Sequence, residues 1–176
     1  MRRRLETLRL SLEPVTAEDV TGLRAHWMQQ GVRRYLWDGN VVTEEEVRKM
    51  IESSERQFEG LGVGLWAVRK SGTPELIGCA GFWYFHEPPE LELVYSLSEA
   101  YWGRGLGREC VSALIQHVFD DLDWTSVQAS ADAPNAASLQ LMRALGMQPF
   151  GRRPGAFGAI EVFRMTRREW RARAAS

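Results

Sequence analysis

The chain has 176 residues, of which 44% are hydrophobic and 26% charged; this composition fits one soluble domain over residues 1–176 and excludes wholesale disorder. Its formal net charge of −1 argues against a globally basic nucleic-acid binder, so no nucleic-acid partner is expected. No stretch approaches the ~20 apolar residues of a membrane helix, and no signal-peptide pattern follows the first arginines. We therefore expect a cytoplasmic protein without a membrane partner.

The cysteines and histidines do not form a ligand pattern. Cys79 and Cys110 lie in apolar surroundings, no CxxC pair exists, and the three histidines are scattered. Zinc sites and disulfide scaffolds need such residues at close, regular spacing. We expect neither a metal nor a disulfide, as is typical of a reducing cytoplasm.

The first third of the chain predicts one strand and two helices. Residues 7–14 alternate apolar and polar side chains, so one strand face should carry Leu8, Leu10 and Leu12. A helix is expected over 17–28, after a threonine N-cap. A second helix is expected over 44–59, where Thr and Glu three residues apart form a capping box. The glycine-containing stretch 29–42 between them is predicted to be mostly loop.

The rest of the chain predicts hairpins followed by a strand–helix–strand unit. Three strands, separated by Ser-Gly and Pro-Pro turns, are expected over 63–70, 75–85 and 90–97. Next come a helix over 105–119, a strand over 124–130, a helix over 135–145 that ends at a glycine, and two strands over 147–165 around a turn at 154–158. The order β-α-α-β-β-β-α-β-α-β-β predicts a mixed α/β (α+β) sheet rather than a doubly wound one.

The most informative segment is Tyr-Trp-Gly-Arg-Gly-Leu-Gly-Arg-Glu, residues 101–109, between a strand and an amphipathic helix. Its three glycines allow tight turning and close approach, and the amides of a helix N-terminus suit a phosphate. Arg104 and Arg108 could add charge-assisted contacts. Glycines at this place can also serve the turn alone. Neither a Walker A loop nor a Rossmann GxGxxG fits, since the required residues are missing at 108–110.

These residues resemble the GNAT acetyltransferase superfamily, and within it the branch containing the ribosomal-protein alanine N-acetyltransferases. The strand 92–97 and the loop 102–109 are similar to its core motif; its next motif is matched by Asn135, Ser138, Gly146 and Met147. The tail 162–170 resembles the closing strand, and 32–36 with 43–47 its helical region. Two departures stand out: Trp102 replaces the Gln or Arg of many members, and Met142 replaces the tyrosine that protonates the departing thiolate. The resemblance implies a GNAT-like fold with splayed central parallel strands.

The resemblance also implies roles around the cofactor. Backbone amides would bind the pyrophosphate at Arg104, Gly105, Leu106, Gly107 and Arg108. Backbone groups along the pantetheine would come from Val94, Tyr95 and Leu97. Asn135 would bond the cofactor arm, or serve only as an N-cap. Ser138 would donate a proton to the sulfur, or be an ordinary surface serine.

The base and the acceptor pocket are also predicted. Glu92 lies in an otherwise apolar strand, where an ionised carboxylate is costly, and is the candidate base, directly or through water. The alternative is a solvated Glu92 on an open face beside Glu87 and Glu90. Aromatics near the acceptor site of the family are Trp27, Tyr35, Trp37 and Trp83, although each taken singly is typical of a core. His86 is predicted to be a surface histidine at a turn.

The implied reaction is direct attack of a primary amine on acetyl-CoA in a ternary complex. The acceptor could be a protein N-terminus, an aminoglycoside-like antibiotic or a polyamine, and a homodimer is allowed. The missing tyrosine leaves a second hypothesis, a non-catalytic acyl-CoA sensor or interaction domain. Arginines at both ends predict solvated termini, or alternatively a ribosome- or phosphate-directed patch: Arg2–Arg4, Arg164, Arg167, Arg168, Arg171 and Arg173.

Overall fold

The computed structural model describes residues 4–174, and within them eight strands form one sheet in the order β1-β2-β3-β4-β5-β6-β8-β7. The strands are β1 (Leu5–Glu6), β2 (Leu10–Pro14), β3 (Leu65–Lys70), β4 (Leu76–Phe85), β5 (Glu90–Leu97), β6 (Ser126–Asp132), β7 (Gln148–Gly155) and β8 (Gly158–Thr166). The helices are α1 (Val20–Trp27), α2 (Gln30–Leu36), α3 (Glu44–Leu61), α4 (Leu106–Asp120), α5 (Ala136–Ala144) and α6 (Arg167–Ala174), with short 3-10 turns η1 (Ala17–Asp19) and η2 (Glu99–Tyr101). The predicted mixed α/β sheet is confirmed.

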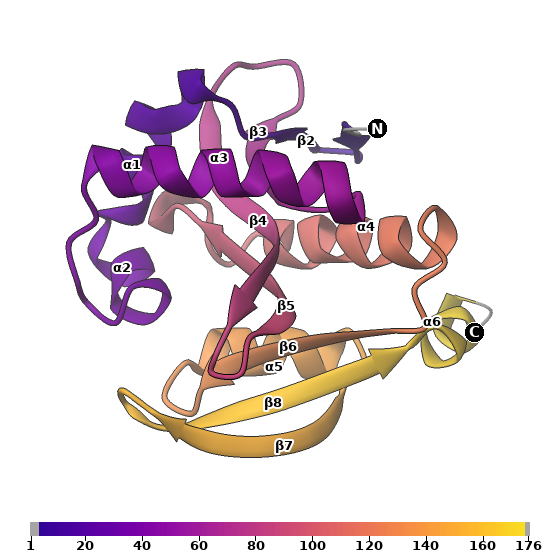
Figure 1. Ribbon diagram of the computed structural model, residues 1–176. Helices are drawn as coiled ribbons and strands as arrows, with labels where there is room; N and C mark the ends of the chain where they lie inside the picture. Colours follow the sequence, from indigo (N-terminus) through magenta and orange to yellow (C-terminus); the bar gives the residue numbers. More distant parts are fainter. Residues whose placement is uncertain (1–3, 175–176) are drawn as a thin grey trace.

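Helices cover both faces of this sheet (Figure 1). Successive strand residues point to opposite faces, so β3 sends Leu65 and Ala67 into a core with α1, α2 and α3, and Trp66 and Val68 into a core with α4 and α5. The α3 helix begins at the predicted capping box, with Glu46 N donating to Thr43 Oγ1 at 3.2 Å. These two cores pack against the two faces of the sheet.

The central strands β5 and β6 are splayed. They run parallel, but the register pairs them only at Leu93 and Ala129. On the other side β5 forms a long antiparallel ladder with β4, in which Ser98 N donates to Ile77 O at 2.8 Å. Because alternate residues bond across such a ladder, the main chain of Val94 engages β4, whereas the main-chain groups of Tyr95 and Leu97 face the gap.

The segment 29–42, predicted to be mostly loop, contains the helix α2, so that prediction was wrong and the helical region implied by the resemblance is confirmed. An isolated helix of this length is unstable in water, and here tertiary contacts hold it. Gly31 N donates to Glu99 Oε1 at 2.6 Å, and a Cβ added at Gly31 would lie 2.4 Å from the Trp102 ring. The glycine that suggested a loop instead permits close docking of a helix.

The N-terminal strand also differs from its prediction. Leu10 and Leu12 are buried, but Leu8 is 90% exposed, because residues 7–9 turn the chain between β1 and β2 instead of continuing one strand. Glu109, at the start of α4, accepts hydrogen bonds from Thr7 Oγ1 at 2.5 Å and Arg9 N at 2.8 Å. A residue a hundred positions away therefore holds this turn, and local alternation could not reveal it.

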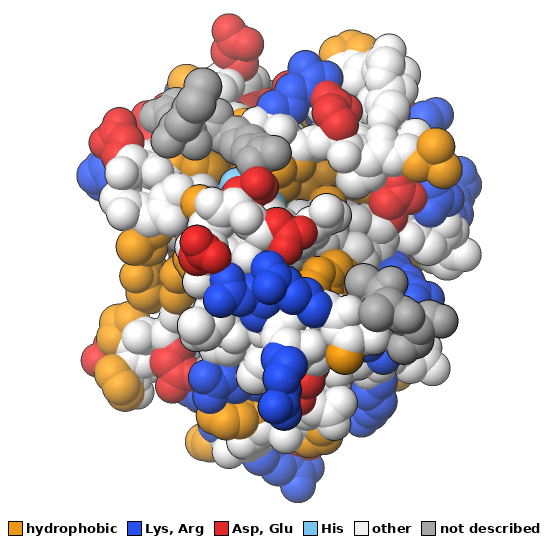
Figure 2. Space-filling view, turned by 90° about the vertical axis from the view of Figure 1, so that its right-hand side faces the viewer, with side chains coloured by type: hydrophobic (Ala, Val, Ile, Leu, Met, Phe, Trp, Pro, Cys, Tyr) orange, Lys and Arg blue, Asp and Glu red, His pale blue; other side chains and the backbone are white. Residues whose placement is uncertain are grey.

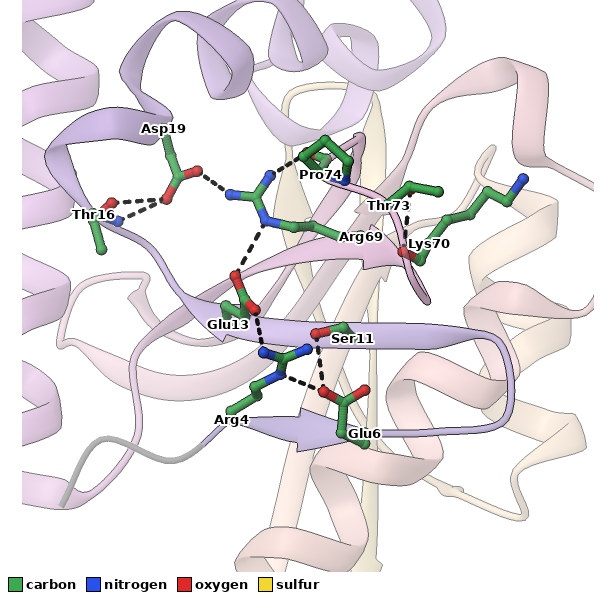
Figure 3. A network of polar contacts seen from close by, with 10 residues as sticks. All are labelled: Arg4, Glu6, Ser11, Glu13, Thr16, Asp19, Arg69, Lys70, Thr73 and Pro74. Carbon is green, nitrogen blue, oxygen red and sulfur yellow. Dashed lines mark hydrogen bonds and ion pairs between the residues drawn. The ribbon is translucent and has the colours of Figure 1, made fainter.

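An ion-pair network joins the sheet edge to the beginning of α1 (Figure 3). The Arg69 guanidinium on β3 pairs with Asp19, lies 3.4 Å from Glu13 Oε2 and donates to Pro74 O at 2.9 Å. Arg4 Nη1 reaches the other oxygen of Glu13 at 3.0 Å. Asp19 also accepts from Thr16 N, so the network fixes the direction in which the chain leaves the sheet.

Arg164 lies on β8, and the other C-terminal arginines lie on α6, a helix that was not predicted: the strand pattern ended at residue 165, and the resemblance gave 162–170 as a closing strand. Arg167 Nη1 pairs with Asp123 Oδ1 at 2.7 Å, Arg171 lies 3.8 Å from Asp120, and Arg173 donates to the Ala144 carbonyl at 2.9 Å. Figure 2 views the molecule from the side on which α6 lies in Figure 1, and it shows blue Lys and Arg side chains over the middle and lower part of this side. Arg2 and Arg3 lie outside the described residues. These contacts of Arg167, Arg171 and Arg173 with α4, α5 and the segment after α4 give the three arginines a structural role.

His26 anchors α1 on β5. Its Nδ1 lies 2.9 Å from Ser98 Oγ and its Nε2 lies 2.8 Å from Ser96 Oγ, in a buried position. Burial lowers the pKa of His26 from 6.5 to about 4, against an opposing contribution from the Ser96 bond. The neutral ring therefore belongs to the folded state, whereas the unfolded chain takes up a proton below pH 6.5.

The first prediction concerns acid stability. Because the pKa is depressed in the folded state, stability should fall as pH drops from 6.5 towards 4, by about 3 kcal/mol from this residue. A His26→Gln variant keeps a neutral side chain at all pH values. Urea unfolding at pH 7 and pH 4.5 should show a smaller loss for the variant than for the wild type. Equal losses in both proteins would contradict a neutral buried His26.

Candidate active site

A cleft of about 810 Å³ lies where β5 and β6 separate. Its walls come from β5, the end of β6, the loop before α4, the beginning of α5, and α2. The cleft brings together most of the predicted site residues: Tyr35, Glu92, Val94, Tyr95, Leu97, Arg104, Gly105, Leu106, Gly107, Arg108, Asn135 and Ser138. Predicted residues from four separate stretches of sequence therefore share one site.

The glycine loop presents free amides to this cleft. Gly103 and Gly105 adopt φ of 71° and 75°, and Gly105 is the N-cap of α4. Glu109 N makes a helical bond back to Gly105 O at 3.2 Å, so the amides before it are the unbonded donors of a helix N-terminus. Aligned with the positive end of the helix dipole, these donors form a site for an anion.

The loop is braced from behind. Arg9 donates to the Arg104 carbonyl at 2.9 Å and pairs with Glu109 Oε2 at 2.7 Å. The Trp102 indole donates to Leu97 O at 2.7 Å, and the Arg104 guanidinium lies 5.5 Å from the Tyr101 ring centre. These contacts hold the loop without using its α4 amides, which leaves the amides available to a ligand.

Ser138 contacts Tyr95, and the sequence did not predict this contact. Asn135 Oδ1 accepts from Ser138 N at 3.3 Å, as its N-cap alternative requires, while both residues line the cleft. Ser138 Oγ lies 3.2 Å from Tyr95 Oη. Burial raises the pKa of Tyr95, which the Ser138 bond partly offsets, so its hydroxyl stays protonated. Met142 occupies the family's tyrosine position, but β5 supplies a phenol to the same region.

Glu92 is buried, with 1% of its surface exposed, so the solvated alternative was wrong. It accepts from Gln128 Nε2 at 2.9 Å and from the Ser130 hydroxyl, both on β6. His86 Nε2 lies 3.2 Å from Glu92 Oε1. Three polar partners thus orient a carboxylate at the cleft wall, where a proton acceptor could act on a bound amine.

The predicted aromatic residues divide between cleft and core. Tyr35 lines the cleft, with its ring 5.7 Å from that of Phe157. Trp27 is buried against Trp37, with ring centres 5.2 Å apart, and both pack in the α1–α3 core. Trp83, opposite Glu92 on β4, packs against the same core. These three tryptophans lie behind the cleft lining, as single aromatics commonly do.

Sequence reasoning missed several polar residues of the cleft, among them Asp38, His86, Ser130 and Asp132. His86 flanks a predicted hairpin turn six residues before Glu92, a spacing that could have indicated their contact. The sequence did not indicate a site role for Asp38 or Asp132. Asp38 follows a helix that was predicted as loop, and Asp132 ends a strand that was predicted to finish at residue 130.

Other chemistries find little support in the described part of the chain. Within residues 4–174 no three His, Cys, Asp or Glu side chains are placed to hold a metal ion. No helix in that range is long and apolar enough to cross a membrane. Both cysteines are free and buried, and burial raises the pKa of Cys110 to about 12. A thiol with such a pKa is a poor nucleophile.

The family follows from comparison with known proteins. Residues 9–148 match the family model described as "Acetyltransferase (GNAT) domain". The chain belongs to the GNAT acetyltransferase family. This GNAT chain is 29% identical over 149 residues to "Uncharacterized N-acetyltransferase p20" of Bacillus licheniformis, covering 84% of the chain and 83% of that protein. It is 27% identical over 148 residues to "Uncharacterized N-acetyltransferase YoaA" of Bacillus subtilis (strain 168), covering 84% of both.

Solved structures share the fold. An acetyltransferase from Agrobacterium tumefaciens superposes with a TM-score of 0.78 at 22% identity, over 94% of this chain and 95% of that one. RimL, a ribosomal L7/L12 alpha-N-protein acetyltransferase in complex with coenzyme A, has a TM-score of 0.78 at 17% identity, over 93% and 98%. The chain is thus an N-acetyltransferase of the GNAT family, and the predicted GNAT-like fold is confirmed.

Proposed function

We propose that this chain transfers an acetyl group from acetyl-CoA to a primary amine by direct attack in a ternary complex. The observation that carries the proposal is the set of free amides at the beginning of α4, opening onto the gap between β5 and β6. A pyrophosphate on those amides would aim the rest of the cofactor along the gap. The CoA complex of RimL supports the same class of co-substrate.

Binding is assigned to main-chain groups. The amides of residues 104–108 hold the pyrophosphate, with Arg104 and Arg108 adding positive charge. The gap-facing main-chain groups of Tyr95 and the amide of Leu97 pair with the pantetheine as a neighbouring strand would, while Val94 contributes only to the cleft wall. Asn135 caps α5 beside the cofactor arm.

Chemistry is assigned to polar side chains on opposite sides of the gap. Glu92, directly or through water, accepts the proton that the attacking amine loses. The amine nitrogen bonds to the thioester carbon, and the carbon–sulfur bond then breaks. Ser138, paired with Tyr95, returns a proton to the departing sulfur. Holding both substrates in one cleft supplies proximity, which is worth much because the thioester is already activated.

The proposal is tested by thiol release from acetyl-CoA with a panel of amines: peptide N-termini, polyamines and aminoglycosides. Release that depends on an amine supports it. Tight CoA binding with no release across the panel would instead favour the non-catalytic sensor, to which Met142 gave some support. Binding of ATP in competition with CoA would point to a nucleotide-binding module.

The second prediction concerns the proton donor. Ser138→Ala and Tyr95→Phe should each lower kcat by about 10²-fold, as loss of a general acid does. Because the two hydroxyls form one hydrogen-bonded pair, the double variant should be little worse than either single one. Steady-state kinetics of the three variants measure this. Fully additive losses would show that the hydroxyls act separately, and unchanged kcat would remove both from proton donation.

A further inference from the structure

One acidic pair in the cleft has no role in the proposed proton transfers. Asp132 is the last residue of β6 and Asp38 lies just beyond α2, and both line the cleft. Asp132 is only 8% exposed; its carboxylate accepts a hydrogen bond from its own backbone amide, and among residues 4–174 no ion pair to it is formed. Burial raises the pKa of Asp132, and the nearby charge of Asp38 raises it further.

The other carboxylates of this cleft wall have hydrogen-bond or ion-pair partners. Glu92 accepts hydrogen bonds from β6 side chains, and Glu90 pairs with Arg153 Nη2 at 2.9 Å. The Arg153 bond, with a second from Gln128, lowers the pKa of Glu90. Burying a carboxylate without a partner is costly. Asp132 therefore lacks the side-chain partners that Glu90 and Glu92 have.

The surrounding chain packs closely beside the Asp132 carboxylate, which still lines the cleft. Gly155 on β7 passes close to it: a Cβ there would lie 3.3 Å from Asp132 Oδ1 and 2.5 Å from Ile160. The β7–β8 turn brings Phe157 against Tyr35 of α2, in an edge-to-face contact. An aromatic ring beside acidic groups favours a cationic ligand.

The position of the pair relative to the candidate base defines what can bind. Ser130, whose hydroxyl bonds Glu92, and Asp132 are two residues apart on β6 and share one face of the sheet. One such repeat is roughly 7 Å along a strand. A cation at Asp132 therefore lies a short spacer away from an amine that is deprotonated at Glu92.

We propose that Asp132 and Asp38 form a subsite for a second cationic nitrogen, so that the acceptor is a small diamine or polyamine rather than a monoamine. This inference rests on the proposed acetyl transfer. One nitrogen loses its proton at Glu92 and attacks the thioester. The other stays protonated and is held by the acidic pair, which orients the acceptor.

The test compares 1,4-diaminobutane with 1-aminobutane, which differ by one amine, in thiol release at saturating acetyl-CoA. The wild type should prefer the diamine by about 10²-fold in kcat/KM, the size expected for a partly buried charge pair. Asp132→Asn should reduce this preference to within a few-fold. Asp38→Asn, at the exposed rim, should remove a smaller part. The control Glu59→Gln removes an exposed carboxylate of α3, distant in sequence from every cleft element, and should keep the preference.

A binding measurement separates this inference from the transfer reaction. N,N,N′,N′-tetramethyl-1,4-diaminobutane has two tertiary amines that cannot be acetylated to a neutral amide. Calorimetry should show that it binds the CoA complex of the wild type and binds Asp132→Asn at least tenfold more weakly. Three results would overturn the subsite: equal binding of this ligand to the wild type and to Asp132→Asn, equal kcat/KM for monoamine and diamine, or a higher kcat/KM for a peptide whose N-terminal amine is its only basic group. Absence of thiol release with every amine would refute acetyl transfer alone, since the calorimetry still tests the subsite.

Discussion

A Gly105→Glu variant should lose CoA binding by more than about 10²-fold while remaining folded. The new carboxylate would stand at the N-cap of α4, where the proposed pyrophosphate meets the free amides, and would repel it. The substitution also places a side chain at φ of 75°, which costs about 1–2 kcal/mol. A Cβ at this position meets only Arg9 Nη2, at 3.6 Å, so the fold has room for it.

Two controls separate charge and strain in that experiment. Gly72→Glu introduces the same side chain at φ of 77° in an exposed turn with nothing within 4 Å, far from the α4 loop in sequence. It should lose a similar amount of stability and keep full CoA affinity. Gly105→Ala carries the strain without the charge and should weaken CoA only modestly. Calorimetry gives the affinities and thermal unfolding the stabilities. An unchanged affinity in Gly105→Glu would place the pyrophosphate elsewhere.

A Glu92→Gln variant should lower kcat by about 10²-fold and change acetyl-CoA affinity little, because it removes a proton acceptor and leaves the α4 amides intact. The carboxamide has one acceptor oxygen, whereas Gln128 and Ser130 donate to two different oxygens of Glu92. One bond is therefore lost or reversed, and stability should fall by about 1–3 kcal/mol. Kinetics from pH 6 to 9, with CoA binding measured alongside, distinguish the two effects.

Glu90→Gln is the matched control for this variant. Glu90 lies two residues earlier on β5 and shares the Gln128 amide, but it is paired with Arg153. Its neutralisation disturbs the same network without removing the buried carboxylate, so kcat should stay within a few-fold of the wild type. Turnover of Glu92→Gln equal to the wild type at every pH would remove Glu92 as the base.

Much of the site could be predicted because its signals are local. The loop glycines, the helix that follows them and the capping threonine of α3 depend on residues within one or two turns of each other. The contacts that complete the site are not local. Tyr95 and Ser138 are 43 residues apart, and Glu92 meets β6 partners 36 and 38 residues later. No periodicity in either segment indicates such pairs.

The sequence by itself determined the order of most strands and helices, the glycine loop before α4 and the family resemblance, since propensity, capping and glycine geometry act over a few residues. The tertiary structure decided which of these residues meet. It turned a glycine-containing segment into α2 by docking Gly31 against Trp102, and it exposed Leu8 by binding its turn to Glu109. It also buried Asp132 without an ion pair among residues 4–174. Burial and long-range contact are properties of the packed chain, because they depend on groups that the fold alone brings together.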